Sequence, residues 1–394
     1  MQKNNHSFCM TLRYAMVQGT FWMSFNAIFG FASVYLLSKD FTNSQIGITF
    51  AIAGVISSLL QPLAGDFVDR AKKPRLHATI SFFIICILLC AGSLITGKKQ
   101  FLVIAILYGT MIAFLQVLTP LINSIGMHYI NKGIRINFGI ARGMGSLLYA
   151  VASFVIGRLA DVYTTNVIIF ATILINIMLF LSVFMFQPKT VQIKAENNKK
   201  VQEKSIHKSF AKTYPRFMVL LVGITFLFTS HNILNNYIFQ IVQYHGAGST
   251  EMGRVGALSA ILELPTMFLF FYFHKKISAG NLIKISGLFF TIKAFLTFSA
   301  TSMGMIYIAQ FAQGLGFALF VVASVFYVNQ KIEESDKVKG QAYMTVTNTA
   351  GSVFGSLLGG WLIDTINIPA TLLIATLAGL IGTIIVLFSS DGKR

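Results

Sequence analysis

The chain has 394 residues, of which 55% are hydrophobic and only 11% are charged. An average soluble domain carries about 25% charged residues, so this composition excludes a soluble globular enzyme, a disordered chain and a disulfide-stapled secreted domain. The formal net charge of +18 would suggest nucleic-acid binding in a soluble protein. Here the basic residues fall in short gaps between apolar segments, so we expect no nucleic-acid partner.

Twelve runs along the chain are long and apolar enough to cross a membrane, which takes about 20 helical residues. Their ranges are 14–37, 44–67, 76–96, 101–127, 138–160, 164–187, 217–243, 252–273, 281–300, 303–329, 340–363 and 368–389. Most of the 31 Lys and Arg residues share one side if both termini are cytoplasmic, which predicts that orientation. We expect an all-α protein of the bacterial inner (plasma) membrane with twelve transmembrane helices.

The longest polar stretch, 188–216, is rich in lysine and divides the chain almost in half. This composition is typical of a solvated segment and predicts a basic cytoplasmic linker. We therefore expect an N-terminal bundle of six helices at 1–187 and a C-terminal bundle of six helices at 217–394.

The two halves resemble each other at a constant shift of 203 residues. This shift places Pro62 on Pro265 and Asp161 on Asp364. The common shift favours an internal duplication. Such repeats are typical of secondary transporters, which bind substrate between them near the middle of the membrane.

The first span carries a polar stripe. Gln18, Trp22 and Asn26 follow one another at intervals of four residues, so they share one face of a helix. Lipid excludes amides, so this face is expected to point into the bundle. The stripe indicates either substrate binding or hydrogen bonds between helices.

The seventh span has a similar concentration of polar residues at His231, Asn232 and Asn235. This many amides are more typical of a water-filled cavity than of a dry interface between helices, which makes these residues candidates for substrate binding. His231 alone could titrate near neutral pH. No second ligand stands near it, so we expect no metal site and no cofactor.

Two charged residues fall in the middle of predicted spans. Glu263 is the one acidic residue so placed, and a charged group there costs about 2.5–3.5 kcal/mol. It must protonate or find a cation, which makes it the best candidate proton carrier. Lys293 is also placed mid-span, and a lysine in a low dielectric can lose its proton. We expect these two residues to couple proton movement, the alternative being a structural ion pair between them.

The segment after the second span reads Gly65-Asp-Phe-Val-Asp69-Arg70-Ala-Lys72-Lys73. It is similar to the G-x-x-x-D-R/K-x-G-R/K-R/K signature of the major facilitator superfamily, with Lys72 at the second glycine. A carboxylate and several cations on this face can form ion pairs that break and re-form as the halves move. Gly65, Asp69 and Arg70 are therefore candidates for conformational gating.

Within that superfamily the chain resembles the oligosaccharide:proton symporter group, which includes lactose permease. The stretches that carry this resemblance are Leu60-Gln-Pro-Leu-Ala-Gly65, Asn137-Phe-Gly-Ile-Ala-Arg142, Glu263-Leu-Pro-Thr266 and Phe298-Ser-Ala-Thr-Ser302. The resemblance implies that Arg142 binds substrate, with the aromatic Tyr149 seven residues later on the same helix face. The acid that pairs with this arginine in the family falls on Asn123, and a coupling histidine falls on Gln313. Both are candidate substrate-binding residues, and loss of the acid suits a substrate that brings its own carboxylate.

These observations favour a transporter over an enzyme. The chain has no phosphate-binding loop of the G-x-x-x-x-G-K-S/T type, so an ion gradient is the expected energy source. We predict proton-coupled uptake of a small polar organic solute, such as a sugar or glycoside, by a functional monomer that alternates access. The alternatives are uptake of a nucleoside or an aromatic or sugar acid, a drug or metabolite efflux antiporter, a facilitator, and a membrane sensor that transports nothing.

Overall fold

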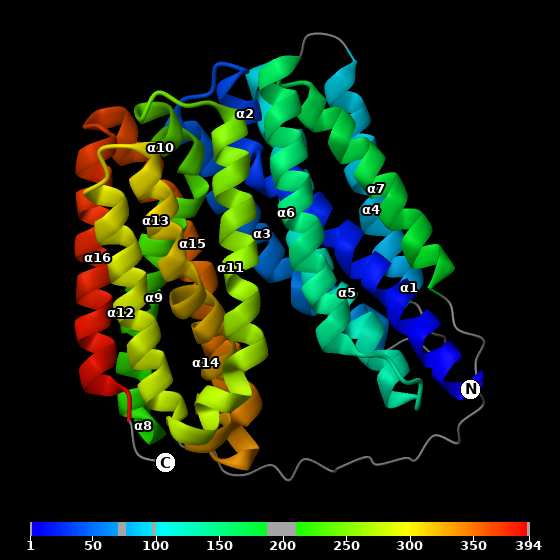
Figure 1. The fold of residues 1–394 in the computed structure, drawn as a ribbon, viewed down its shortest axis with the longest axis vertical. Helices are drawn as coiled ribbons and strands as arrows, with labels where there is room; N and C mark the ends of the chain where they lie inside the picture. The colour runs from blue at the N-terminus through cyan, green and yellow to red at the C-terminus, as the bar shows by residue number, and fades with distance from the viewer. Residues whose placement is uncertain (1, 70–75, 97–99, 187–209, 392–394) are drawn as a thin grey trace.

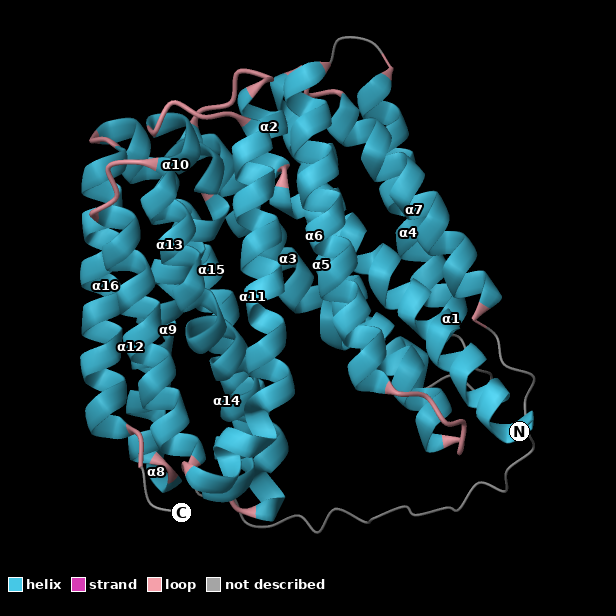
Figure 2. Ribbon diagram, viewed as in Figure 1, coloured by secondary structure: helices cyan, strands magenta, loops and turns pink. Residues whose placement is uncertain are grey.

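The computed structural model describes residues 2–69, 76–96, 100–186 and 210–391. Within these ranges the chain is almost entirely helical, in two groups of helices (Figures 1 and 2). The first group comprises α1 (Gln2–Phe25), η1 (Asn26–Gly30), α2 (Ala32–Leu37), α3 (Asn43–Asp69), α4 (Leu76–Ile95), α5 (Phe101–Asn131), α6 (Phe138–Val162) and α7 (Val167–Met185). The second comprises α8 (Phe210–Thr213), α9 (Pro215–Asn236), α10 (Ile238–Tyr244), α11 (Ser249–Lys276), α12 (Ala279–Phe298), α13 (Met303–Gln313), η2 (Gly314–Ala318), α14 (Leu319–Lys331), η3 (Glu334–Asp336), α15 (Lys337–Thr365) and α16 (Ile368–Ser389).

Eleven helical spans in the described ranges are long and apolar enough to cross a membrane. Two of them are composite, since Phe8–Leu37 joins α1, η1 and α2, and Met303–Lys331 joins α13, η2 and α14. The remaining span predicted from the sequence, 340–363, corresponds to α15. Its many glycine, serine and threonine residues make it less apolar, and it packs against α9 and α3. Small side chains suit such close helix contacts. The predicted all-helical membrane fold is confirmed, with α15 as its least apolar span.

Large apolar side chains cover much of the outside of the helices. Leu89, Phe184 and Phe388 are examples, and Phe388 is 89% exposed. In water such a surface would be unstable, but lipid tails are as apolar as these side chains. The predicted linker at 188–216 lies mostly outside the described residues. Its last residues form α8 and the first turn of α9, where Pro215 suits the start of a helix.

The two groups meet along α6 and α11 and along α3 and α15. At one end of the molecule, which we call the closed end, the end of α6 is hydrogen-bonded to the start of α11. The Asp161 carboxylate accepts hydrogen bonds from the backbone N–H groups of Ser249 at 2.9 Å and Thr250 at 2.6 Å. A carboxylate at a helix N-terminus satisfies free N–H groups and interacts favourably with the helix dipole.

The same contact is made in the opposite direction by α15. The Asp364 carboxylate accepts hydrogen bonds from the backbone N–H groups of Asn43 at 3.1 Å and Ser44 at 2.6 Å, which begin α3. Asp161 and Asp364 are the residues that the 203-residue shift places on each other. Each group therefore caps a helix of the other group with an equivalent aspartate.

Glycines allow the helices to approach closely at this end. A Cβ atom on Gly253 of α11 would lie 2.3 Å from the Ser153 carbonyl oxygen of α6. A Cβ atom on Gly47 of α3 would lie 2.2 Å from the Ser356 carbonyl oxygen of α15. Any larger residue at either glycine would separate the two groups. At the opposite end, where α1 begins and α16 ends, the two groups diverge (Figure 1).

Candidate functional site

A glutamine side chain connects the two charged residues of the second group. Gln313 Nε2, at the end of α13, donates a hydrogen bond to Glu263 Oε1 in the middle of α11 at 2.9 Å. The oxygen of the same amide accepts a hydrogen bond from Lys293 Nζ of α12 at 2.7 Å. An ammonium only donates and a carboxylate only accepts, so these two neighbours determine the orientation of the amide.

This arrangement differs from the direct Lys293–Glu263 ion pair that the sequence left open as a structural alternative. Within the described residues the contact between these two charges runs through Gln313. Lys293 is 3% exposed and Gln313 is 4% exposed, so water has little access to this contact. A buried charge needs hydrogen-bonding partners, and the amide supplies one to each of the two charges.

The chain of hydrogen bonds continues to α9. Lys293 Nζ donates to Asn235 Oδ1 at 3.3 Å, and Asn235 Nδ2 lies 2.7 Å from His231 Nε2. Because an amide nitrogen only donates, Nε2 accepts and the proton of the neutral ring is on Nδ1. The His231 ring stacks on Phe317 of η2 with centroids 4.9 Å apart. Glu263, Gln313, Lys293, Asn235 and His231 form what we call the Glu263–His231 network.

The first group contributes a second polar cluster, centred on Gln18 of α1. Gln18 Nε2 donates to the Tyr14 hydroxyl at 2.7 Å and to Asn123 Oδ1 of α5 at 3.0 Å. Gln18 Oε1 accepts from Trp22 Nε1 at 3.2 Å. Both ends of this fully buried amide are therefore occupied by protein. Sequence reasoning missed Tyr14, although it stands four residues before Gln18 on the same helix face.

Arg142 of α6 lies against Trp22. Its guanidinium carbon is 4.2 Å from the centroid of the Trp22 ring, and one of its nitrogens donates to Ser146 Oγ at 3.1 Å. Trp22 comes this close because residue 145 is glycine, where a Cβ atom would lie 2.6 Å from the indole. The sequence placed Tyr149 on the same helix face as Arg142, as an aromatic ring for the substrate. The ring that lies against the guanidinium itself is that of Trp22, which an adjacent helix supplies.

Tyr149 lies instead beside Asn26, nearer the closed end. A Cβ atom on Gly30 would be 3.0 Å from Asn26 Nδ2 and 3.5 Å from the Tyr149 hydroxyl. Asn26 is 1% exposed, and its Oδ1 atom has no hydrogen-bond partner in the described part of the chain. It begins η1, and Gln313 directly precedes η2. Single π-helical turns occur frequently at functional sites.

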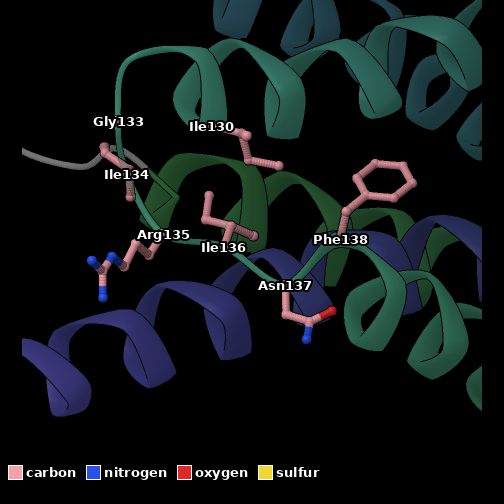
Figure 3. Close-up of a pocket in the computed structure, with 7 residues that line it drawn as sticks. All are labelled: Ile130, Gly133, Ile134, Arg135, Ile136, Asn137 and Phe138. Atoms are coloured by element: carbon pink, nitrogen blue, oxygen red, sulfur yellow. The ribbon is translucent and has the colours of Figure 1, made fainter.

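Other predicted site residues lie elsewhere or are not described. Asn232 donates to the Phe228 carbonyl oxygen of its own helix at 2.8 Å, which is a local contact. Gly65 lies in the last part of α3, where an added Cβ atom would meet nothing within 4 Å, and α3 ends at Asp69. Arg70 lies outside the described residues. A pocket at the turn between α5 and α6, lined by residues 130 and 133–138, contains none of the candidate site residues (Figure 3).

The two clusters face each other across the interface between the groups. Glu263 interacts electrostatically with Arg142 of the first group and with Lys293 of the second. One carboxylate is thus shared by two cations that belong to different groups. A site of this kind can bind a polar solute between the groups and respond to loss or gain of a proton.

A bundle of membrane-spanning helices in two groups, with a polar site between them, is typical of multi-pass membrane transporters, and the family match identifies the chain as one of the major facilitator superfamily. The chain belongs to the MFS_1 like family, which matches residues 13–373. It is 25% identical over 401 residues to the uncharacterized transporter YwbF of Bacillus subtilis (strain 168), covering 99% of this chain and 96% of the relative. It is 22% identical over 375 residues to the maltose permease of Geobacillus stearothermophilus, covering 95% and 93%.

Solved structures share the fold. A mutant form of the nucleoside transporter NupG superposes with a TM-score of 0.80 at 12% identity, covering 97% of this chain and 100% of that one. A bacterial homologue of the human lysosomal transporter Spinster, in an inward-facing and occupied conformation, gives a TM-score of 0.69 at 12% identity, covering 98% and 97%. At these identities the likeness establishes the fold alone, and the predicted major facilitator fold is confirmed.

Proposed function

We propose that the protein takes up a small, ring-bearing polar solute together with a proton by alternating access. The observation that carries the proposal is the Glu263–His231 network, which links four helices of the second group and ends at one carboxylate. Protonation removes the charge of a buried carboxylate. Here the loss of that charge changes the hydrogen bond from Gln313, and through Gln313 the hydrogen bond from Lys293. Protonation at Glu263 therefore changes contacts on which the packing of α11, α12 and α13 depends.

Sugars and glycosides are the solute class we propose first. The maltose permease to which the chain is similar supports a sugar, as does the resemblance to oligosaccharide:proton symporters. The aromatic face of Trp22 and the forked donors of Arg142 suit a ring that carries oxygen atoms. A proton gradient equivalent to about 100 mV supplies about 2.3 kcal/mol, which sustains a solute gradient on the order of fiftyfold.

The proposal is tested by the pH of a weakly buffered suspension of de-energised cells that express the protein. Sugars, glycosides, nucleosides and aromatic acids are added one at a time. A solute that enters with a proton raises the external pH, and Glu263→Gln should abolish that rise. The matched control is Glu251→Gln on the same helix, because Glu251 binds Arg254 and Tyr307 at the closed end. A pH rise that survives Glu263→Gln contradicts the assignment of the proton to this carboxylate.

A further inference from the structure

The charges of the candidate site do not balance. Arg142 and Lys293 contribute two positive charges, and among the described residues Glu263 is the one carboxylate that interacts with both. His231 accepts a hydrogen bond at Nε2 from Asn235, which is the geometry of the neutral ring. The described part of the site therefore has an excess of one positive charge when Glu263 is ionised.

The unbalanced charge belongs to Arg142 rather than Lys293. Lys293 donates to the amide oxygens of Gln313 and Asn235, so protein dipoles surround it. Arg142 has five N–H donors, and the described residues give it one hydrogen bond, to Ser146 Oγ. The guanidinium carbon lies 4.2 Å from the centroid of the Trp22 ring, and the other N–H groups of Arg142 have no hydrogen-bond acceptor in the described part of the chain.

No acid of the first group takes that place in the described residues. Asn123, at the position where the family resemblance implies a carboxylate, is neutral and accepts a hydrogen bond from Gln18. The shared partner Glu263 is already bonded to Gln313. A planar guanidinium with a free edge binds carboxylates through two parallel hydrogen bonds, which is the strong form of this contact.

We propose that the transported solute is an organic monoanion, a ring-bearing acid whose carboxylate binds the free edge of the Arg142 guanidinium above Trp22. This inference rests on the proton-coupled uptake proposed above and replaces neutral sugars and glycosides, its first solute class, with ring-bearing acids. It selects uronic and aryl-carboxylic acids over neutral sugars and nucleosides of the same size.

The shared carboxylate couples the two cargoes. When Glu263 takes up a proton, its negative charge, which Arg142 shares with Lys293, is lost. Arg142 then binds the solute carboxylate more tightly. By thermodynamic linkage, the bound anion raises the affinity of Glu263 for the proton by the same factor. The charged and titratable groups that face Glu263 are Arg142 and Tyr149 from α6 and Lys293 from α12, with His231 of α9 beyond Lys293. One proton and one monoanion carry no net charge, so transport is electroneutral.

Binding is measured through Trp22 itself. The chain has two tryptophans, and Trp361, which is 54% exposed on α15, is replaced by phenylalanine so that Trp22 alone fluoresces. Purified protein is titrated with matched pairs of probes: glucuronate and glucose, and 3-phenylpropionate and 3-phenylpropanamide. We expect saturable quenching by at least one acid with at least tenfold higher affinity than its neutral partner, increasing as pH falls from 8 to 6.

Three variants separate the roles of Asn123, Arg142 and Glu263. Asn123→Asp is nearly isosteric and places a negative charge in the cluster around Gln18, so it should lower the preference for the acid over its neutral partner at least tenfold. Arg142→Gln should remove the preference for the acid. In Glu263→Gln the pH dependence of acid binding should disappear. Acids that quench no better than their neutral partners, or not at all, overturn the proposal.

Transport assays separate this inference from the proposed function. In proteoliposomes with an internal pH dye, we expect the acid to acidify the lumen without a substrate-induced current. Proton-coupled uptake of a neutral solute, with a current, would support the proposed function and overturn the anionic solute. Acid-selective binding without any proton movement would support the anionic solute and overturn proton coupling.

Discussion

Gln313 holds two opposite charges apart while it remains bonded to both. Its amide nitrogen faces Glu263 and its oxygen faces Lys293. A hydrocarbon side chain in its place would leave a buried ammonium and a buried carboxylate each short of a partner. Each unsatisfied group costs about 1–3 kcal/mol, and more when it is charged. At the residue scale, then, the proposed coupling site consists of three side chains rather than an ion pair.

We predict that Gln313→Leu lowers proton-coupled uptake at least tenfold and destabilises the protein by about 1–3 kcal/mol, because both charges lose a hydrogen bond. Uptake of the solute identified in the pH assay and thermal unfolding in detergent measure the two effects. Gln310→Leu is the control, since Gln310 is 2% exposed and bonds to the Ile306 carbonyl oxygen of its own helix. Equal losses in both variants would show that Gln313 has no special role.

The sequence was sufficient to single out Glu263 and Lys293, because a charge within an apolar run is rare and conspicuous. It could not predict the bridge through Gln313, which depends on how α13 is rotated where it meets η2. In the same way, spacing along α6 placed Tyr149 on the face of Arg142 but gave no sign that Trp22 lies against the guanidinium. Helix periodicity identifies which residues share a face, but the neighbouring helix decides what that face touches, and here it supplies Trp22.

The helices of the two groups are joined by a reciprocal pair of caps at the closed end. Asp161 at the end of α6 caps α11, and Asp364 near the end of α15 caps α3. A negative charge at a helix N-terminus is worth about 0.3–1 kcal/mol. The caps bind elements of different groups, so we expect them to stabilise the conformation in which this end is closed. The internal shift of the sequence identified both aspartates, but it did not indicate what they bind.

We predict that Asp161→Asn and Asp364→Asn each increase the population of molecules open at this end by roughly two- to fivefold, and that the effects add in the double variant. Spin labels at Thr164→Cys and Ile366→Cys, with the three native cysteines replaced, report the distance between the groups.

Asp40→Asn is the matched control for the caps. It makes the same change of charge at the same end, and asparagine tolerates the left-handed backbone of Asp40, where φ is 62°. We expect the control to leave the distance distribution unchanged. A double cap variant that behaves like this control would contradict a role for the caps in closure.

At the scale of the whole molecule, the structure is closed at the end where the caps lie, and its two groups diverge toward the end where α1 begins (Figure 1). If both termini are cytoplasmic, as the distribution of basic residues predicts, the caps lie on the outer side of the membrane. The candidate site lies between these ends, at the interface of the groups. Alternating access then requires the caps to open while the opposite end closes. In the coupling that we propose, Glu263 changes its protonation state between these two conformations.

The most direct test of this account compares active accumulation with exchange in proteoliposomes that contain Glu263→Gln. Accumulation against a gradient requires a proton to move, whereas exchange of labelled for unlabelled solute requires only binding and alternating access. The account predicts that the variant loses accumulation driven by a proton gradient and keeps exchange at a rate within about threefold of the wild type. Accumulation that persists in Glu263→Gln, or exchange that disappears with it, would contradict the assignment of Glu263 as the group that couples the proton to transport.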